Sequence, residues 1–363
     1  MDLLLNINTI GLILQNNEFI SKNLFMFIKI FFYLCIFIFV LLDKRLKKSE
    51  VNLIIFSIFI LFISKRMYLT TFLLIIIAIN RKYYKRYYLI NFISLLLLLT
   101  LVTGFSKIGV IDNNILKYKI YGYEGIQIRQ SLGFGNPNTS GIIFWLIRCS
   151  FYYLNYYKIK FHHFIILGIL VFILYLQTYS RTSLLIFCFE VMLFYIMKYK
   201  YKILKKIIVV IPLIHVLGTF LLSIFFYDTK LNDLLSGRLS YSHIFLKNVN
   251  LQNFFFGNKE NFYLALDNAW IALLQNYGML VLLSMLILMI LGIKNMLKFE
   301  SKIESKKIIF LFLICLCYST SEAVLFSPYY SFIIMILIKY NFLRGEKNVK
   351  SRNIKKSTIS NAR

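Results

Sequence analysis

Long apolar stretches bounded by lysine and arginine recur along the whole chain, and they constrain its fold more than any other feature. Of the 363 residues, 59% are hydrophobic and 18% are aromatic. A soluble protein of this composition would expose far more apolar surface than soluble proteins do. About 20 apolar residues are enough to cross the hydrocarbon core of a bilayer as a helix. The sequence therefore predicts an all-α, polytopic integral membrane protein.

We predict about eleven transmembrane helices, with a range of ten to twelve because residues 3–14 are only weakly apolar. Residues 1–343 form one membrane domain in this prediction, followed by a basic cytoplasmic tail at 344–363. The short pair within 51–80 is expected to be a tight helical hairpin, because basic clusters flank it on both sides. The predicted spans are residues 23–42, 51–64, 67–80, 88–106, 141–155, 164–179, 183–197, 207–226, 269–293, 308–323 and 329–343.

The net charge of +27 would suggest a nucleic-acid partner in a soluble protein. Here the basic residues gather in short loops between apolar spans, where they orient the protein and meet anionic lipid headgroups. We therefore expect membrane lipids, and no nucleic acid, as partners. The positive-inside rule places the short basic loops in the cytoplasm. Two long connections, at about 107–140 and 227–268, then fall on the external side, and their polar character places function there.

Several motifs of soluble enzymes are missing from the sequence. We find no phosphate-binding G-x-x-x-x-G-K-[ST], no Rossmann glycine pattern and no H-E-x-x-H. There is no Asp-x-Asp pair to hold a metal-bound nucleotide sugar, and the four histidines are scattered. We therefore expect chemistry without a metal or a cofactor, at the external membrane face, with the energy source built into the substrate.

Three arginines lie in predicted external segments: Arg129, Arg181 and Arg238. Guanidinium groups bind phosphate through paired, charge-assisted hydrogen bonds without a metal. A single loop arginine is more often merely solvated, so the argument depends on three arginines from different loops. Arg129 precedes the turn-rich stretch "GFGNPNTSG", whose Asn136 and Asn138 are candidate substrate-binding residues.

Asp267 and Asn268 open the predicted span at 269–293, and Glu322 lies at the outer end of the span at 308–323. Asp267 could cap the helix, because Asp and Asn satisfy free backbone N–H groups at helix starts. It could instead accept a proton from a substrate hydroxyl. Arg148 and Glu190 lie inside predicted spans, where an unpaired charge is energetically costly, and we expect the two side chains to form an ion pair.

The ordered motifs resemble the O-antigen polymerase and ligase superfamily, which includes Wzy-type polysaccharide polymerases and WaaL-type ligases. The resemblance covers roughly residues 50 to 330, and its individual motifs are degenerate. The ligases carry His-Asn, nine residues and then Gly, whereas this chain has Asp267-Asn268, nine residues and then Gly278. Aspartate in place of the ligase histidine favours a polymerase. The motifs that carry the resemblance are Arg129 with "GFGNPNTSG", then "TYSRTSLL", "SGRLS", "FFFGN" and "DNAWIALLQNYG".

The resemblance implies transfer of a growing glycan from undecaprenyl diphosphate to the next lipid-linked repeat, at the external face of a bacterial plasma membrane. The product would be capsule, exopolysaccharide or O-antigen. A flippase and chain-length regulator proteins are the implied protein partners. A ligase and a polysaccharide transporter remain the alternatives. The implied site consists of Arg129, Arg181 and Arg238 for the pyrophosphate, Asp267 or Glu322 as the base, and Asn136, Asn138 and Asn268 for substrate binding.

Overall fold

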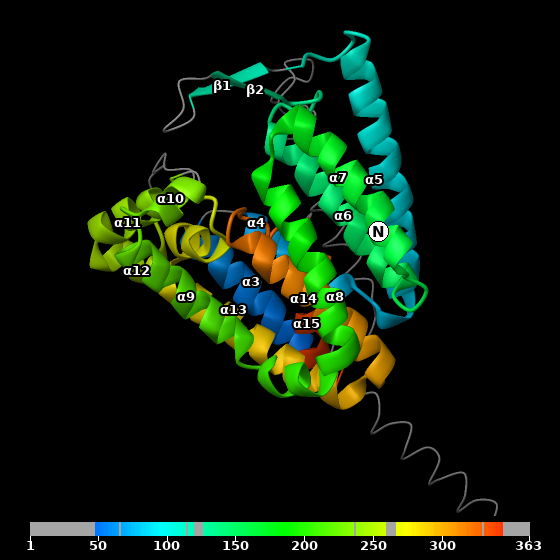
Figure 1. The fold of residues 1–363 in the computed structure, drawn as a ribbon. Coiled ribbons are helices and arrows are strands. Elements are labelled where there is room, and N and C mark those ends of the chain that lie inside the picture. Colours follow the sequence, from blue (N-terminus) through cyan, green and yellow to red (C-terminus); the bar gives the residue numbers. More distant parts are fainter. Residues whose placement is uncertain are drawn as a thin grey trace, which may run out of the picture.

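The computed structural model describes residues 48–64, 67–113, 115–119, 126–235, 237–258, 266–328 and 330–343. These residues are mainly helical, as predicted, and they also contain a two-stranded β hairpin at one end of the molecule (Figure 1). The predicted span at 23–42, the weakly apolar residues 3–14 and the predicted tail at 344–363 lie outside the described residues.

Every predicted span after residue 50 coincides with a helix. The pair predicted within 51–80 forms two packed helices, α3 and α4. The helices at predicted spans are α3 (Lys48–Ser64), α4 (Met67–Ala78), α5 (Tyr84–Lys107), α6 (Pro137–Asn155), α7 (Phe161–Thr178), α8 (Arg181–Ile207), α9 (Ile211–Phe225), α13 (Ala269–Phe299), α14 (Lys302–Ser319) and α15 (Phe332–Lys339). Two 3-10 helices, η1 (Arg81–Tyr83) and η2 (Tyr340–Phe342), precede α5 and follow α15.

The prediction of eleven spans was wrong for the described part of the chain, where four helices are long and apolar enough to cross a membrane. The other helices fall short in length or in apolar character. α4 has 12 residues and α15 has 8, against the roughly 20 that a perpendicular span needs. α14 has 18 residues, but its first turns carry four charged side chains within "KIESKK". The four qualifying helices are Arg81–Lys107, Phe161–Thr178, Arg181–Ile207 and Ala269–Phe299.

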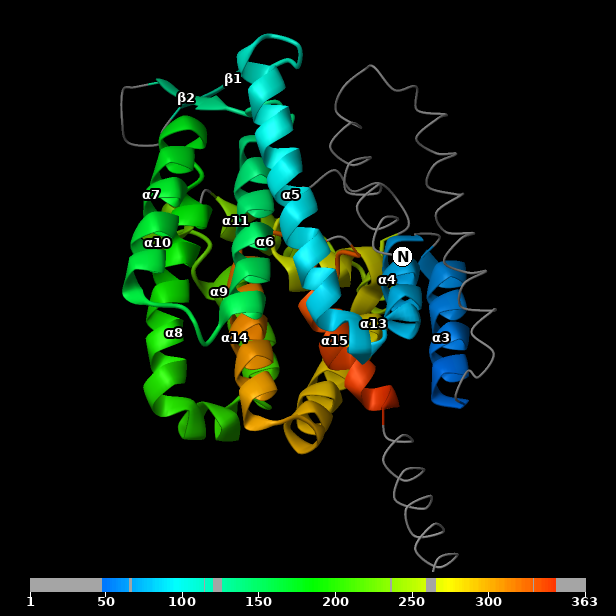
Figure 2. The same ribbon diagram turned by 90° about the vertical axis from the view of Figure 1, so that its right-hand side faces the viewer.

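The helices form two neighbouring groups. In the first, α5, α6, α7 and α8 pack in chain order, and Figure 2 shows them rising toward the end where the hairpin lies. In the second, α13 packs against α3, α9 and α15, and α15 also packs against α4. α14 joins the groups, because it contacts α6 and α8 on one side and α13 and α15 on the other.

The two long connections contain regular structure that the sequence analysis did not predict. In the first, β1 (Ile115–Lys119) pairs antiparallel with β2 (Ile126–Gln130), and Leu116 lies opposite Arg129. In the second lie three short helices, α10 (Lys230–Leu234), α11 (Arg238–Asn248) and α12 (Leu251–Phe256). Five-residue strands and a polar helix such as α11 carry little hydrophobic periodicity, so these elements could not be predicted from the sequence pattern.

α12 ends against a kink in α13, and two glycines allow the close approach. Gly278 interrupts α13 at φ 82° and ψ 172°, a conformation that essentially only glycine adopts. A Cβ atom at Gly278 would lie 2.2 Å from the carbonyl oxygen of Phe255, and one at Gly257 would lie 2.7 Å from the amide nitrogen of Tyr277. The amide of Asn258 also donates to the carbonyl of Gln275 at 2.7 Å. The second connection is therefore fixed, backbone to backbone, onto α13.

The charged pair predicted inside the spans is confirmed. Arg148 on α6 and Glu190 on α8 are both fully buried, and Arg148 Nε and Nη2 each donate to a carboxylate oxygen of Glu190 at 2.9 Å. The hydroxyl of Tyr152 donates to the same carboxylate at 2.8 Å. Because both charges are paired and hydrogen-bonded, the cost of burying them is reduced, and the pair ties α6 to α8.

Candidate active site

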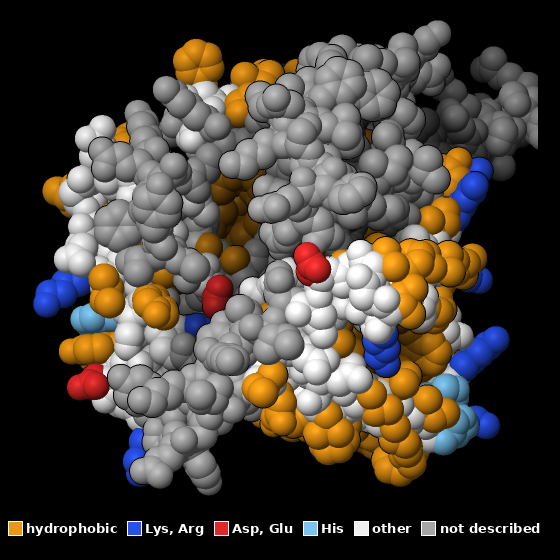
Figure 3. Space-filling model, turned by 90° about the horizontal axis from the view of Figure 1, so that it is seen from above, with side chains coloured by type: hydrophobic (Ala, Val, Ile, Leu, Met, Phe, Trp, Pro, Cys, Tyr) orange, Lys and Arg blue, Asp and Glu red, His pale blue; other side chains and the backbone are white. Residues whose placement is uncertain are grey.

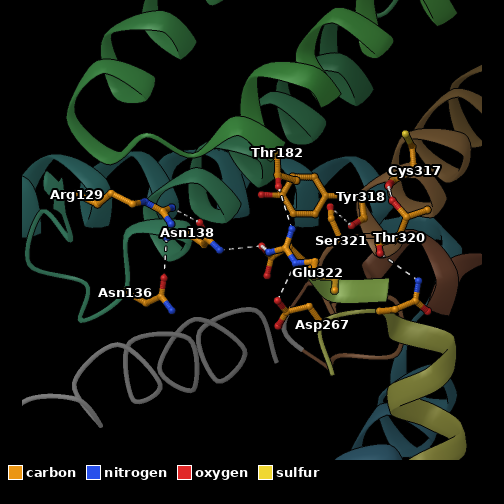
Figure 4. Close-up of polar contacts among 12 residues, drawn as sticks. Arg129, Asn136, Asn138, Thr182, Asp267, Cys317, Tyr318, Thr320, Ser321 and Glu322 are labelled. Atoms are coloured by element: carbon orange, nitrogen blue, oxygen red, sulfur yellow. Dashed lines mark hydrogen bonds and ion pairs between the residues drawn. The ribbon is translucent and has the colours of Figure 1, made fainter. Parts of the chain in front are cut away.

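A network of charged and polar side chains joins six segments at the end of the molecule nearer the hairpin (Figure 4). Seen from above, acidic and basic side chains gather beside a recess near the middle of this face (Figure 3). The segments are β2, the start of α6, the start of α8, the start of α11, Asp267 before α13 and the turn after α14.

Arg238 is the centre of this network and the first residue of α11. Gly237, at φ 79°, is the N-cap residue and turns the chain sharply into the helix. Arg238 Nε donates to Asp267 Oδ2 at 2.8 Å, and Nη2 donates to Glu322 Oε1 at 3.1 Å. Nη1 lies 3.4 Å from the hydroxyl oxygen of Thr182 on α8. One guanidinium group therefore joins two carboxylates and a hydroxyl group from three other parts of the chain.

Glu322 lies in the turn that follows α14, where its amide donates to the carbonyl of Tyr318 at 3.1 Å. Its Oε1 accepts hydrogen bonds from Arg238 and from Asn138 Nδ2, each at 3.1 Å. Burial raises the pKa of Glu322 to about 7, although the positive charge of Arg238 opposes this shift. The negative charge of Asp267 raises the pKa further, and Arg129 lowers it. Glu322 is thus a carboxyl group that changes its charge near neutral pH.

Arg129 extends the network from β2. Its Nη2 donates to Asn138 Oδ1 at 2.8 Å, and its Nε donates to the backbone carbonyl of Thr178, at the end of α7, at 2.8 Å. Asn138 therefore bridges Arg129 and Glu322 through the two ends of its amide group. The sequence prediction named Arg129, Asn138 and Glu322 but did not show that the asparagine connects the other two.

The stretch "GFGNPNTSG" brings Asn138 into place. Gly133 and Gly135 have φ angles of 85° and 73°, which turn the chain from β2 toward α6. Asn136 is the N-cap residue of α6, and its side chain accepts from the amide of Asn138 at 2.8 Å. Pro137 occupies the first helical turn, where its missing N–H group costs nothing. The turn-rich loop therefore begins α6 and delivers the Asn138 side chain to the network.

Two predicted site residues stand apart from the network. Asn268 is the N-cap residue of α13, because its Oδ1 accepts from the amides of Trp270 and Ile271, while its Nδ2 donates to the carbonyl of Thr320. Asn268, and not Asp267, is therefore the helix cap. Arg181 begins α8 with an exposed side chain that makes no hydrogen bond or ion pair with the described residues.

Sequence reasoning missed Thr182, which contacts Arg238, and the carbonyl of Thr178, which accepts from Arg129. Both lie within the "TYSRTS" corner between α7 and α8. The only signal in the sequence was the presence of a polar corner between two apolar helices. Tyr179 holds the corner with a positive φ of 48°, and this conformation ends α7.

An apolar cavity of about 260 Å³ lies beside the network. It includes Ala323, which follows Glu322, and Ala269, which follows Asn268. Tyr68 on α4 also lines the cavity, and its hydroxyl donates to Ser327 Oγ at 2.7 Å. The other residues that line the cavity are Leu69, Ala272, Leu273, Asn276, Tyr277 and Phe326.

The described part of the site holds two arginines and two carboxylates. Arg238 is 14% exposed and Glu322 is 12% exposed, whereas the side chain of Asp267 is 41% exposed. Such an arrangement can bind an anion through guanidinium groups and can exchange a proton through a carboxylate. The described residues contain no group of three or more His, Cys, Asp or Glu side chains that could hold a metal ion.

No protein-family model, no curated protein and no solved structure matches the chain.

Proposed function

We propose that this protein is a Wzy-type polysaccharide polymerase that joins lipid-linked oligosaccharide repeats at the external face of a bacterial plasma membrane. The observation that carries the proposal is the convergence of Arg129 and Arg238 with Asp267 and Glu322, from distant parts of the chain, at one end of an apolar helical protein. An anionic, lipid-linked donor suits a site of this composition. Capsule, exopolysaccharide and O-antigen are the product classes.

In this reaction a hydroxyl group of the next lipid-linked repeat attacks the anomeric carbon of the growing glycan. The new glycosidic C–O bond forms while the C–O bond to the diphosphate breaks. Undecaprenyl diphosphate leaves with the electron pair of that bond, and the hydroxyl proton passes to a carboxylate. The donor bond supplies the free energy, so the step needs neither a nucleotide nor a metal ion.

The roles of the residues follow from their contacts. Arg238 and Arg129 stabilise the negative charge that develops on the leaving diphosphate. Asp267 is the proposed base, because its side chain is the most exposed carboxylate of the network and Arg238 holds its orientation. Asn138 positions Arg129 and Glu322 relative to each other by hydrogen bonds to both side chains. Asn136 and Asn268 support the site by capping α6 and α13.

Arg181 remains a proposed second contact to the substrate. Its exposed side chain begins α8 directly before Thr182, which reaches Arg238. An exposed guanidinium group at the edge of the network is available to a diphosphate or to the sugar acids of a glycan. Lysine substitution at position 181 should therefore weaken substrate binding more than it slows the chemical step.

The proposal is tested with purified protein in liposomes that contain lipid-linked repeat units and no nucleotide sugar. We expect polymer of several repeats to form, and to form equally in excess EDTA. Loss of activity in EDTA with rescue by magnesium would refute the metal-independent step. Translocation of the repeats across the liposome membrane without growth in length would indicate a transporter. Transfer only to a lipid A core acceptor would indicate a ligase.

A further inference from the structure

We propose that Asp267 and Glu322 compete with the donor's diphosphate for Arg238, so that anion binding at this site is coupled to proton uptake by Glu322. The inference rests on the proposed function for the identity of the anion. It concerns binding alone, and it can therefore be tested without polymerisation.

The two carboxylates occupy the edge of Arg238 that a phosphate would use. Nε and Nη2 lie along one edge of the planar guanidinium group and present two parallel N–H groups. A phosphate binds such an edge with two oxygen atoms at once. Here Asp267 Oδ2 lies 2.8 Å from Nε, and Glu322 Oε1 lies 3.1 Å from Nη2. A phosphate that takes this edge must therefore displace one oxygen atom from each carboxylate.

An anion that binds the other edge of the guanidinium group would also meet the Glu322 carboxylate. This edge presents Nη1 and Nη2, and Thr182 faces Nη1 at 3.4 Å. Nη2 is the same atom that donates to Glu322. An anion bound at this edge would still lie beside the Glu322 carboxylate, and repulsion between like charges is strong where water is largely excluded. Neutralising Glu322 removes this repulsion.

Glu322 is better suited than Asp267 to take up the proton. It is 12% exposed, whereas Asp267 is 41% exposed and in contact with water. The groups that face Glu322 are Arg238 from α11, Arg129 from β2, Asp267 before α13, and the phenols of Tyr318 and Tyr330. A diphosphate would occupy Arg238 and add negative charge, and both effects favour the protonated carboxyl group.

Whether anion affinity rises or falls with pH follows from the protonation of Glu322 in the protein without bound anion. Burial raises the pKa of Glu322 to about 7, so the group is largely protonated below that pH and largely ionised above it. Below about pH 7 the anion meets a neutral carboxyl group. Above about pH 7, binding of the anion requires that Glu322 take up a proton. The affinity for the anion therefore falls as the pH rises, by up to about tenfold per pH unit for one proton.

The test measures binding of P1,P2-dimethyl diphosphate to the purified protein in lipid nanodiscs by titration calorimetry. Each phosphorus of this probe carries one strongly acidic oxygen, so its charge stays constant between about pH 6 and pH 9. We expect the affinity to fall by roughly tenfold or more between about pH 6.5 and pH 8.5. Titrations in two buffers of different ionisation enthalpy should report uptake of about one proton at pH 8.5.

Glu322→Gln preserves the hydrogen-bond acceptor and removes the charge. This variant should bind the probe at pH 8.5 about as tightly as the wild type does at pH 6.5, with little pH dependence. Asp267→Asn should bind more tightly at each pH, and its affinity should still fall as the pH rises, because Glu322 can still take up a proton. Asp228→Asn removes an equal charge from an exposed position and should behave as the wild type. Arg238→Lys should weaken binding throughout the range.

A flat pH profile of the wild type, or no proton uptake at pH 8.5, would overturn the inference even if Glu322→Gln failed to fold. An unchanged slope in Glu322→Gln would overturn it as well. Polymer synthesis with a flat binding profile would remove this inference and leave the proposed function. A steep profile in a protein that makes no polymer would keep the inference and remove the function.

Discussion

At the scale of single residues, the chemistry of the site depends on the shape of the Arg238 side chain. Its three nitrogen atoms contact Asp267, Glu322 and Thr182, each of which comes from a different segment. A lysine ammonium group is a point charge without a planar edge. Lysine would keep the positive charge at this position, but it could not hold three partners in one plane or present two parallel donors to a phosphate.

Arg238→Lys should therefore lose most of the polymerisation activity, with a decrease in rate of roughly 10²–10³. The protein should accumulate in the membrane at a normal level, because lysine keeps the positive charge that pairs with Asp267 and Glu322. The rate of polymer formation in liposomes is the measurement. Arg86→Lys, at an exposed position on α5, is the matched control. Normal polymer length and yield from Arg238→Lys would contradict the proposed role.

Asp267→Asn tests the proposed base. Asparagine accepts a hydrogen bond from Arg238 Nε as aspartate does, but it cannot take up a proton. The loss of general base catalysis should lower the rate by roughly 10²–10⁴. The start of α13 should stay intact because Asn268 is the cap, so abundance and thermal stability should be unchanged. Full activity of this variant would transfer the role of the base to Glu322.

The sequence predicted the charged members of the site better than their connections. Arg129, Arg238, Asp267 and Glu322 could be named because they lie in predicted external segments or at the outer ends of predicted spans. The bridge through Asn138 could not be predicted, because its side chain meets Glu322 across 184 positions of the chain. Residue type predicts what a group can do, whereas its partners depend on the tertiary fold.

At the scale of elements, the apolar periodicity located the helices after residue 50 but did not give their lengths. α4 and α15 are shorter than the spans predicted for them. α8 extends to Ile207, across a kink at Lys200, well past the predicted end at 197. A hydropathy pattern records where side chains are apolar, whereas a helix ends where its backbone groups find caps or turns. The hairpin β1–β2 was missed because five-residue strands give little periodic signal.

Gly278→Ala should destabilise the protein by at least about 2 kcal/mol, because alanine is strained at the observed backbone angles and its Cβ would meet the carbonyl of Phe255. The measurement is the thermal unfolding midpoint of the purified protein. Gly218→Ala on α9 is the control, because a Cβ there meets nothing within 4 Å. Equal midpoints for the two variants would contradict the packing of α12 on α13.

At the scale of the whole molecule, the proposed function requires the network to face the outside of the cell. Asn250, between α11 and α12, and Lys202, late in α8, are both exposed positions. Asn250 lies in the same long connection as Arg238 of the network. The network includes Thr182 at the start of α8, whereas Lys202 lies near the end of that helix. The two positions are therefore predicted to be on opposite sides of the membrane. The exposed native Cys188 on α8 should first be replaced, to remove background labelling.

Asn250→Cys should react with a membrane-impermeant thiol reagent in intact cells, whereas Lys202→Cys should react only after the cells are permeabilised. The positive-inside rule gives the expected sign, because the residues around Lys202 are rich in lysine. The measurement is the labelled fraction of each variant before and after permeabilisation. Labelling of Lys202→Cys in intact cells, without labelling of Asn250→Cys, would reverse the topology and place the network on the cytoplasmic side.

The wide spacing of the network along the chain has a consequence for how the protein is made. Arg129 leaves the ribosome long before Arg238, and Glu322 follows Arg238 by 84 positions. The helices enter the membrane in chain order while this last carboxylate is still to be synthesised. Until then the guanidinium group of Arg238 lacks one of its two carboxylate partners. The network is therefore completed only late, when the turn after α14 folds back onto α11 and Glu322 reaches Arg238 and Asn138.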